Sequence, residues 1–150
     1  VDVNKVANSL GIRIEQSDLG AGCSGLLVRD GDHAVIGVNW DQHPNRQRFT
    51  IAHECGHYVL HDGTTYVDSG YRVNFRDLES GSGTKREEIE ANAFAAALLM
   101  PAVWLSAAFK ERNFELDGDG EDLAELAKEF GVSTQAMAIR LATLGLGSLG

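Results

Sequence analysis

Two histidines and a glutamate form the part of this sequence best suited to chemistry. In the stretch FTIAHECGHYVLH, residues 49–61, His53 and His57 lie four residues apart and Glu54 follows the first histidine. On a helix, positions i and i+4 share one face, so both imidazoles can present a nitrogen to one tetrahedral Zn²⁺. Glu54 is rotated away from that face and can take a proton from a water held on the metal. This arrangement is typical of the His-Glu-x-x-His motif of metalloproteases.

A purely structural interpretation of these residues competes with the metal site. Ile51, Ala52, Val59 and Leu60 make the rest of the helix largely apolar. Two imidazoles and a carboxylate buried on such a helix without partners would cost several kcal/mol. A metal supplies the partner, whereas the alternative is a pair of histidines that are hydrogen-bonded within the core. We favour the metal site.

A third histidine, His61, lies on the same stripe but is not expected to bind the metal. A straight helix carries its imidazole one turn too far from the point that the first two share. The metzincin extension of the motif needs glycine at position 60 and histidine at position 63, where this sequence has Leu60 and Gly63. That subclass is therefore excluded.

A catalytic zinc with two histidine ligands needs a third protein ligand, and a carboxylate from a second helix is the usual one. The segment TKREEIEANAFAAALLMP, residues 84–101, predicts such a helix. Its candidate ligands are Glu87, Glu88 and Glu90. Thr84 and Glu87 fit a capping box, and Glu87 and Glu88 fit a solvated cluster at a helix start.

Glu90 differs from its neighbours because it shares a helical stripe with apolar residues, namely Ala93, Phe94, Ala97 and Leu98. A carboxylate that continues a buried face needs a partner there. We therefore predict Glu90 as the third ligand. Cys55 is a weaker alternative, because it faces away from the point shared by His53 and His57.

The remaining sequence predicts an α+β fold. Apolar spacing, capping residues and turn residues indicate these elements: a helix at 3–10, strands at 12–16, 25–29 and 34–39, helices at 46–60, 84–100 and 102–110, and a helix pair from 121 onward, joined through Gly131 with Ser133 as the N-cap of its second helix. A long polar segment, 62–83, follows the histidine helix. We expect two domains, 1–110 and 111–150, with the second packed on the first.

Composition narrows the setting of the protein. With two cysteines in 150 residues, a disulfide framework is not expected, and we predict a reducing, cytoplasmic location. The first residues show no secretion signal, and no apolar run approaches the ~20 residues that span a bilayer. A net charge of −9 argues against a broad nucleic-acid surface.

Two longer motifs, RFTIAHECGHYVLH and EIEANAFAAALLMP, are similar to those of the ImmA/IrrE family of zinc metallopeptidases. The resemblance extends to the AVIGVN strand and to LAKEFGVSTQAMAIRLATLGL. It implies a zincin-like fold in which a small three-stranded, antiparallel or mixed sheet packs on the two ligand helices. It also implies that His53, His57 and Glu90 bind Zn²⁺ and that Glu54 is the general base. The implied substrate is a helix-turn-helix transcriptional repressor, whose cleavage releases stress-response, prophage or mobile-element genes.

Substrate contacts are less clearly indicated. We expect the strand at 34–39 to be a sheet edge beside the site, where an extended substrate segment could add as a further strand. The group that stabilises the oxyanion has four candidates, all in the long polar segment: Tyr66, Tyr71, Arg72 and Arg76.

The C-terminal helix pair has the spacing of a helix-turn-helix, but its charge does not suit DNA. Residues 121–150 carry four acidic side chains against Lys128 and Arg140, and its second helix offers only Gln135 and Arg140 to a nucleic acid. We favour a packing or substrate-docking role. Two rival hypotheses are a DNA-binding regulator with a structural zinc, and a module that binds its repressor without cleaving it.

Overall fold

The computed structural model describes residues 1–69, 84–111 and 120–146. The chain forms two compact units, Val1–Ala95 and Ala96–Gly150. This division assigns the predicted helix at 102–110 to the second unit, together with the C-terminal helix pair. The expected boundary after residue 110 stays a prediction.

The first unit contains a mixed sheet of four strands, which are β1 (Ile12–Ser17), β2 (Cys23–Asp30), β3 (His33–Asn39) and β4 (Thr65–Ser69). Their spatial order is β1-β3-β2-β4. β1 pairs with β3 in parallel, and the other two pairings are antiparallel. The expected count of three strands is therefore one too low. β4 was missed because its five residues lie in a polar segment that carries little strand signal.

The expectation that the strand at 34–39 is a sheet edge is wrong. β3 lies between β1 and β2 and is hydrogen-bonded on both sides. Its buried run from Ile36 to Asn39 fits a central strand, because such a strand is covered by neighbours as well as by helices. The edges of the described sheet are β1 and β4.

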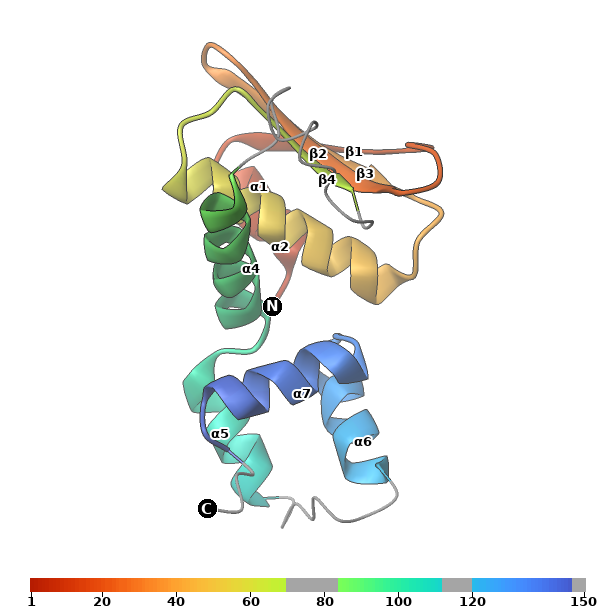
Figure 1. Ribbon diagram of the computed structural model, residues 1–150, viewed down its shortest axis with the longest axis vertical. Helices are drawn as coiled ribbons and strands as arrows, with labels where there is room; N and C mark the ends of the chain where they lie inside the picture. The colour runs from red at the N-terminus through yellow and green to blue at the C-terminus, as the bar shows by residue number, and fades with distance from the viewer. Residues whose placement is uncertain (70–83, 112–119, 147–150) are drawn as a thin grey trace. The chain divides into compact units, whose positions relative to one another are not determined.

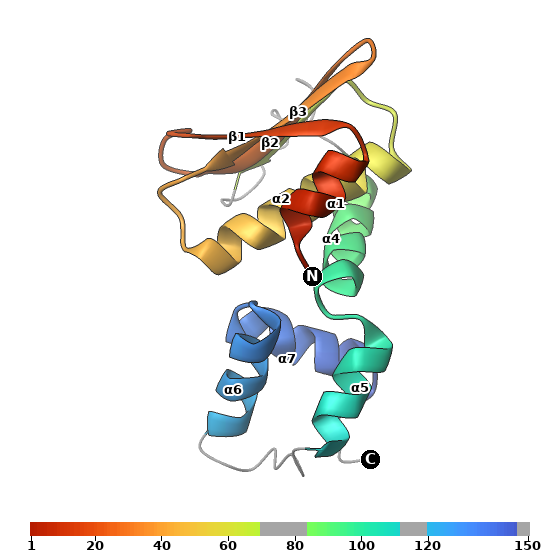
Figure 2. The same ribbon diagram turned by 180° about the vertical axis from the view of Figure 1, so that it is seen from behind.

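Two helices, α1 (Val3–Ser9) and α2 (Pro44–Leu60), cover one face of this sheet (Figures 1 and 2). Pro44 occupies the first turn of α2, where its missing N–H costs nothing. The largest side chains buried between sheet and helices are Ile12, Leu27, Ile36 and Val38. This core holds α2 against β2 and β3.

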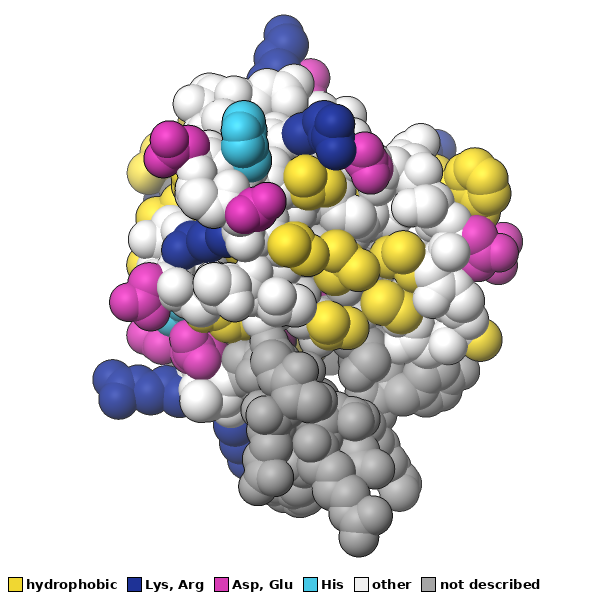
Figure 3. Space-filling view, turned by 90° about the horizontal axis from the view of Figure 1, so that it is seen from above, with side chains coloured by type: hydrophobic (Ala, Val, Ile, Leu, Met, Phe, Trp, Pro, Cys, Tyr) yellow, Lys and Arg dark blue, Asp and Glu magenta, His cyan; other side chains and the backbone are white. Residues whose placement is uncertain are grey.

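The opposite face of the sheet carries an apolar patch, made of Leu26 and Val28 on β2, Val35 on β3 and Val67 on β4. These residues are partners or neighbours in the strand register, and Val28 and Val67 are each 38% exposed. Figure 3 looks onto this side of the molecule and shows hydrophobic side chains gathered at its centre.

A further helix, α4 (Lys85–Leu99), packs closely on α2. At Gly56 of α2, an added Cβ would lie 3.0 Å from the Cβ of Phe94 and 3.2 Å from the Cα of Ala91. Glycine at this position therefore allows the two helix backbones to approach. The predicted capping box starts α4: the Thr84 N–H donates to Glu87 (3.0 Å) and the Glu87 N–H donates to the Thr84 hydroxyl (3.1 Å).

The second unit is helical, with α5 (Ala102–Glu111), α6 (Glu121–Phe130) and α7 (Thr134–Thr143) as its described elements beyond the end of α4. α6 ends at Gly131 in the left-handed conformation (φ 67°), and the Ser133 hydroxyl caps α7 by accepting from the Ala136 N–H. Arg140 donates to the Met100 carbonyl (3.1 Å), so it stabilises this unit. The helix pair is confirmed as secondary structure, and its helix-turn-helix likeness stays a prediction.

Within the described ranges, no single helix has both the length and the apolar character to cross a membrane. The bent pair α4 and α5 reaches those limits only when the two helices are taken together, and Ala91, Ala95, Leu99 and Leu105 of this pair are buried inside the protein.

Candidate metal centre

The middle of α2 is the most buried stretch of helix in the described chain. All eight residues from Thr50 to His57 are buried, and His53, Glu54 and His57 are 2%, 0% and 0% exposed. The two imidazoles lie one turn apart on one face, as their spacing predicts. Their Nε2 atoms are 3.1 Å apart, so both nitrogens point to one location.

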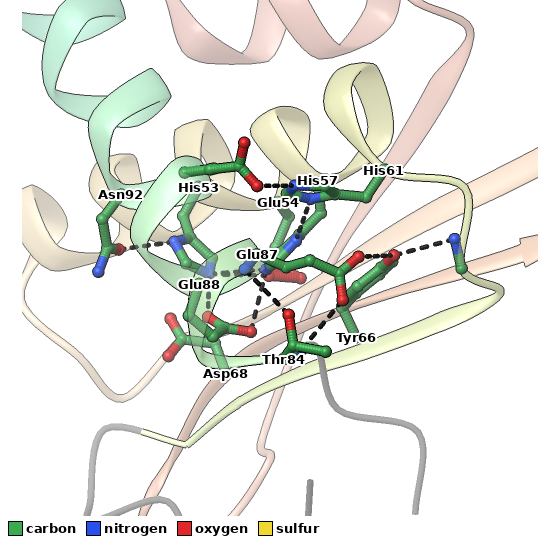
Figure 4. Close-up of polar contacts among 12 residues, drawn as sticks. His53, Glu54, His57, His61, Tyr66, Asp68, Thr84, Glu87, Glu88 and Asn92 are labelled. Carbon is green, nitrogen blue, oxygen red and sulfur yellow. Dashed lines mark hydrogen bonds and ion pairs between the residues drawn. The ribbon is translucent and has the colours of Figure 1, made fainter. Parts of the chain in front are cut away.

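A carboxylate from α4 completes this cluster. Glu88 Oε2 lies 2.9 Å from His53 Nε2, and Glu88 Oε1 lies 3.1 Å from His57 Nε2. One ligand atom from each of the three residues lies within 4.8 Å of the others. Figure 4 shows Glu88 reaching from α4 toward the two histidines on α2. Among the described residues this is the one group of three such side chains that could hold a metal ion.

The structure therefore places Glu88 in the cluster, at the position for which the sequence analysis predicted Glu90. The face of α4 that packs inward carries Ala91, Ala95 and Leu99, which are at most 1% exposed. Glu88 precedes Ala91 by three residues and so begins this stripe. Glu90 lies on another side of the helix, with 46% of its side chain exposed, and its Oε1 is 3.3 Å from His61 Nε2.

The buried stripe of α4 differs from the one that the sequence predicts. Ala93 and Ala97 of the predicted stripe are exposed, whereas Ala91 and Ala95 are buried, and Ala91 lies where α2 approaches closely. The glycine in HECGH was the available signal. A small residue at position 56 predicts a close helix contact, and Ala91 with Ala95 is the matching small stripe on the partner helix.

Glu54 is a buried carboxyl group beside the cluster. Neither of its oxygens has a hydrogen-bond partner in the described structure, and Oε1 lies 3.7 Å from His53 Nε2. Burial raises the pKa of Glu54 well above its usual range, and the charges of Asp68 and Glu88 raise it further. A carboxyl group in this state requires a cation or a proton nearby.

The charge states of His57 and Glu88 also suit the binding of a cation. Burial lowers the pKa of His57, which favours the neutral imidazole that binds metals. Burial alone would raise the pKa of Glu88, but the imidazoles of His53 and His57 hold it down at about 2. Glu88 is therefore a carboxylate near neutral pH. Its Oε1 has no well-directed hydrogen bond, although His57 is close.

These residues fit a metal ion. Two imidazole nitrogens and one carboxylate converge from two helices, and three buried carboxylate oxygens of Glu54 and Glu88 have no hydrogen-bond partner. Two His and one Glu form a known donor set of catalytic zinc sites, with a further position left for water or substrate.

Comparison with known proteins agrees with this geometry. The family model for the IrrE N-terminal-like domain, a peptidase family designated M78, matches residues 7–142. The chain belongs to this family. The expected membership of the ImmA/IrrE family is thereby confirmed, and the family supports a metallopeptidase.

Two relatives carry the name radiation response metalloprotease IrrE. The protein of Deinococcus radiodurans is 37% identical over 108 residues, which are 71% of this chain and 30% of the relative. The protein of Deinococcus deserti is 34% identical over 114 residues, which are 75% of this chain and 37% of the relative. The chain thus spans about a third of the length of these relatives.

Tyr66, one of the four candidates for stabilising the oxyanion, supports the site from β4. Its ring stacks on the His57 imidazole, with centroids 4.1 Å apart and planes 11° apart. Its hydroxyl accepts from the Gly63 N–H (2.9 Å) and donates to Glu87 (3.1 Å), so it is held away from the cluster. The other candidates, Tyr71, Arg72 and Arg76, lie outside the described residues.

The structure also places Cys55 and His61, neither of which was the predicted third ligand. Cys55 is buried and does not belong to the cluster. His61 ends α2 and contacts the far side of His57, with its Nδ1 atom 3.0 Å from His57 Nδ1. It therefore lies behind the candidate ligand rather than beside the metal position.

Proposed function

We propose that this chain is a zinc-dependent metallo-endopeptidase that hydrolyses a peptide bond in a specific protein partner. The observation that carries the proposal is the convergence of His53, His57 and Glu88, with the buried carboxyl of Glu54 beside them. In this proposal the three converging residues are the metal ligands and Glu54 is the general base.

Glu54 would act on both sides of the reaction. A zinc ion in this donor set would supply Lewis-acid activation of a water and of the scissile carbonyl. The Glu54 carboxylate, next to His53 Nε2, takes the proton of the attacking water and later passes it to the leaving nitrogen. The tendency of the buried Glu54 to hold a proton suits the second task.

The substrate is proposed to bind along β4. This strand is the sheet edge next to the cluster, and Tyr66 and Asp68 turn their side chains inward from it (Figure 4). No strand within the described ranges pairs with its other side. An extended segment of the partner can add there through main-chain hydrogen bonds, which β-strand addition requires.

A helix-turn-helix transcriptional repressor is the partner that we propose. The relatives are named for a radiation response, which fits a protease that switches genes under stress. Such a substrate resides with the chromosome, so we propose a cytoplasmic location. The buried Cys55 and half-buried Cys23, both free thiols, are compatible with a reducing compartment.

The direct test uses the full chain with the repressor encoded beside its gene, analysed by intact-mass spectrometry with and without a zinc chelator. We expect a single cut that the chelator abolishes and added zinc restores. Glu54→Gln should retain zinc and lose about 10²–10⁴-fold in cleavage rate, the usual contribution of a general base.

Retained turnover in Glu54→Gln at matched zinc content would reject the base assignment. Repressor release from its operator without any cut would favour the non-cleaving module. Salt-dependent binding of the chain itself to duplex DNA would favour the regulator hypothesis.

A further inference from the structure

The far sides of the two candidate ligand imidazoles are held by different partners. His53 Nδ1 lies 2.8 Å from Asn92 Oδ1, a single side chain of α4. His57 Nδ1 lies 3.0 Å from His61 Nδ1, and His61 Nε2 lies 3.3 Å from Glu90 Oε1. The second arrangement is a chain of two imidazoles that ends on a carboxylate, and Figure 4 shows the first of its links.

Protons can be assigned along this chain from its outer end. A carboxylate oxygen only accepts hydrogen bonds, so the His61 nitrogen that faces Glu90 carries a proton. A neutral imidazole with its proton on Nε2 has a lone pair on Nδ1. In a neutral His61 the Nδ1 atom therefore accepts, and the facing Nδ1 of His57 must donate. His57 is then left with a bare Nε2, which is the atom that points to Glu88 and His53.

The contacts on the inner side agree with this assignment. Glu88 Oε1 is 3.1 Å from His57 Nε2 but has no well-directed hydrogen bond. In the other tautomer of His57, Nδ1 carries a lone pair and would face the lone pair on His61 Nδ1. Only a His61 with its proton on Nδ1 would avoid this, and its Nε2 lone pair would then face Glu90. With the other tautomer of His57, the proton would lie on Nε2, the atom that faces Glu88 and His53, and this nitrogen could not bind a metal.

We propose that His61 and Glu90 are positioning residues that hold His57 in the tautomer that binds metal. The proposal rests on the metal site of the proposed function and adds two residues to it. His61 also lies at the end of α2, where the chain leaves the helix in an extended conformation (φ −127°), so its ring can turn back toward His57. Tyr66 holds the plane of the same imidazole by stacking on it.

The arrangement follows a general rule for metal-binding histidines. The second ring nitrogen usually donates to a carboxylate, a carbonyl or a water, and loss of that partner costs about 10–100-fold in metal affinity. Here Asn92 performs this role directly for His53, whereas Glu90 performs it for His57 through an intervening ring. The two histidines therefore provide an internal comparison.

The test reads the tautomers by ¹⁵N NMR of the full metal-free chain labelled at histidine. We expect His57 to carry its proton on Nδ1. His61→Phe keeps the ring but removes the acceptor, and should shift His57 toward the other tautomer. His61→Asn places an amide oxygen near the former Nδ1 and should restore the wild-type signal. Neither change should move the His53 proton from Nδ1, which faces Asn92, whereas Asn92→Ala should act directly on His53.

Zinc affinity, measured by competition with a chromophoric chelator, gives the second readout. We expect a loss of about 10–100-fold in His61→Phe and near-recovery in His61→Asn. Glu90→Gln keeps an acceptor and should lose less than Glu90→Leu. Leu60→Ala, at an exposed neighbouring position, is the matched control and should bind zinc like the wild type.

The outcomes separate this inference from the proposed function. Wild-type chain that binds no zinc would reject the metal site itself. Zinc binding in the wild type, together with unchanged affinity and an unchanged His57 signal in His61→Phe, would overturn the role of His61 alone. A wild-type His57 with its proton on Nε2 would overturn it as well.

Discussion

The two helices that form the candidate metal centre contribute to it from different parts of their length. α2 brings His53 and His57 from a stretch in which eight consecutive residues are buried. α4 brings Glu88 from its first turn, and the Glu88 side chain is 21% exposed. One helix offers ligands from a packed interior and the other from a helix start.

The two contributions depend on different things: that of α2 on the geometry of one helix, and that of α4 on how the two helices pack. The position of His57 relative to His53 follows from the pitch of one helix. The position of Glu88 depends on the contact at Gly56, on the capping box of Thr84 and on the tie from Tyr66 to Glu87. Changes to α4 and its contacts should therefore alter metal binding while the histidine pair stays in place.

The largest effect is expected from the carboxylates of α4. Glu88→Ala removes a proposed ligand and should lower zinc affinity by two orders of magnitude or more. This corresponds to a binding free energy on the order of 3 kcal/mol, the part of the total for a zinc site that one ligand contributes. Glu90→Ala should lose less, because Glu90 contacts His61 and not the cluster. Chelator competition on both variants measures this, and an equal or larger loss in Glu90→Ala would contradict the placement of α4.

A smaller effect is expected where the two helices touch. In Gly56→Ala the new methyl group meets Phe94 and Ala91, and such overpacking costs about 1–3 kcal/mol. The helix gains up to about 1 kcal/mol from alanine, so we expect a net loss of about 1–2 kcal/mol in urea unfolding and weaker zinc binding.

The matched control for Gly56→Ala is Gly131→Ala in the second unit. There the glycine has φ 67°, which disfavours alanine by a similar amount. This variant should lose stability while its zinc affinity stays at the wild-type value. A fall in zinc affinity as large as that of Gly56→Ala would show that the effect is not specific to the contact between α2 and α4.

The start of α4 gives the next prediction. Thr84→Ala removes one side of the capping box and should destabilise the helix by about 1 kcal/mol. Because Glu88 lies in the first turn of this helix, zinc affinity should fall by no more than about fivefold, the factor that corresponds to 1 kcal/mol. Thr84→Ser, which keeps the hydroxyl, should behave like the wild type in the same competition assay.

The smallest expected signal concerns the interior of α2. Burial, with a further contribution from Glu54, raises the pKa of the Cys55 thiol to about 12. At pH 8 about one thiol in ten thousand is then ionised, so Cys55 should resist iodoacetamide in the folded protein. Cys23, which is half-buried, should react first, as peptide mass mapping can show. Rapid labelling of Cys55 would indicate that the middle of α2 opens.

The same contrast explains what the sequence could predict. The i, i+4 spacing and the capping box are local patterns, and both have their expected form in α2 and α4. β4 and the choice of Glu88 depend on partners distant in the sequence. From the sequence alone, Glu88 is typical of a solvated residue at a helix start. Its position becomes clear only from the packing of α4, in which Ala91 and Ala95 are buried.

The order of the strands in the sheet could not be predicted either, because it also depends on partners distant in the sequence. The alternation in the strand at 34–39 gives its faces but not its neighbours, and only the parallel pairing with β1 makes β3 central. Tyr66 illustrates the point at one side chain. Nothing in its local sequence indicates that its ring covers His57 or that its hydroxyl contacts Glu87.

The separation of the two helices along the chain has a thermodynamic consequence. His57 and Glu88 are 31 positions apart, so an ion bound between them would act as a clip that closes a loop of that length. Restricting such a loop in the unfolded chain is worth on the order of 3–4 kcal/mol if the ion stays bound to both ends. Supply of the ion in the cell would then set the lifetime of the folded chain as well as its activity.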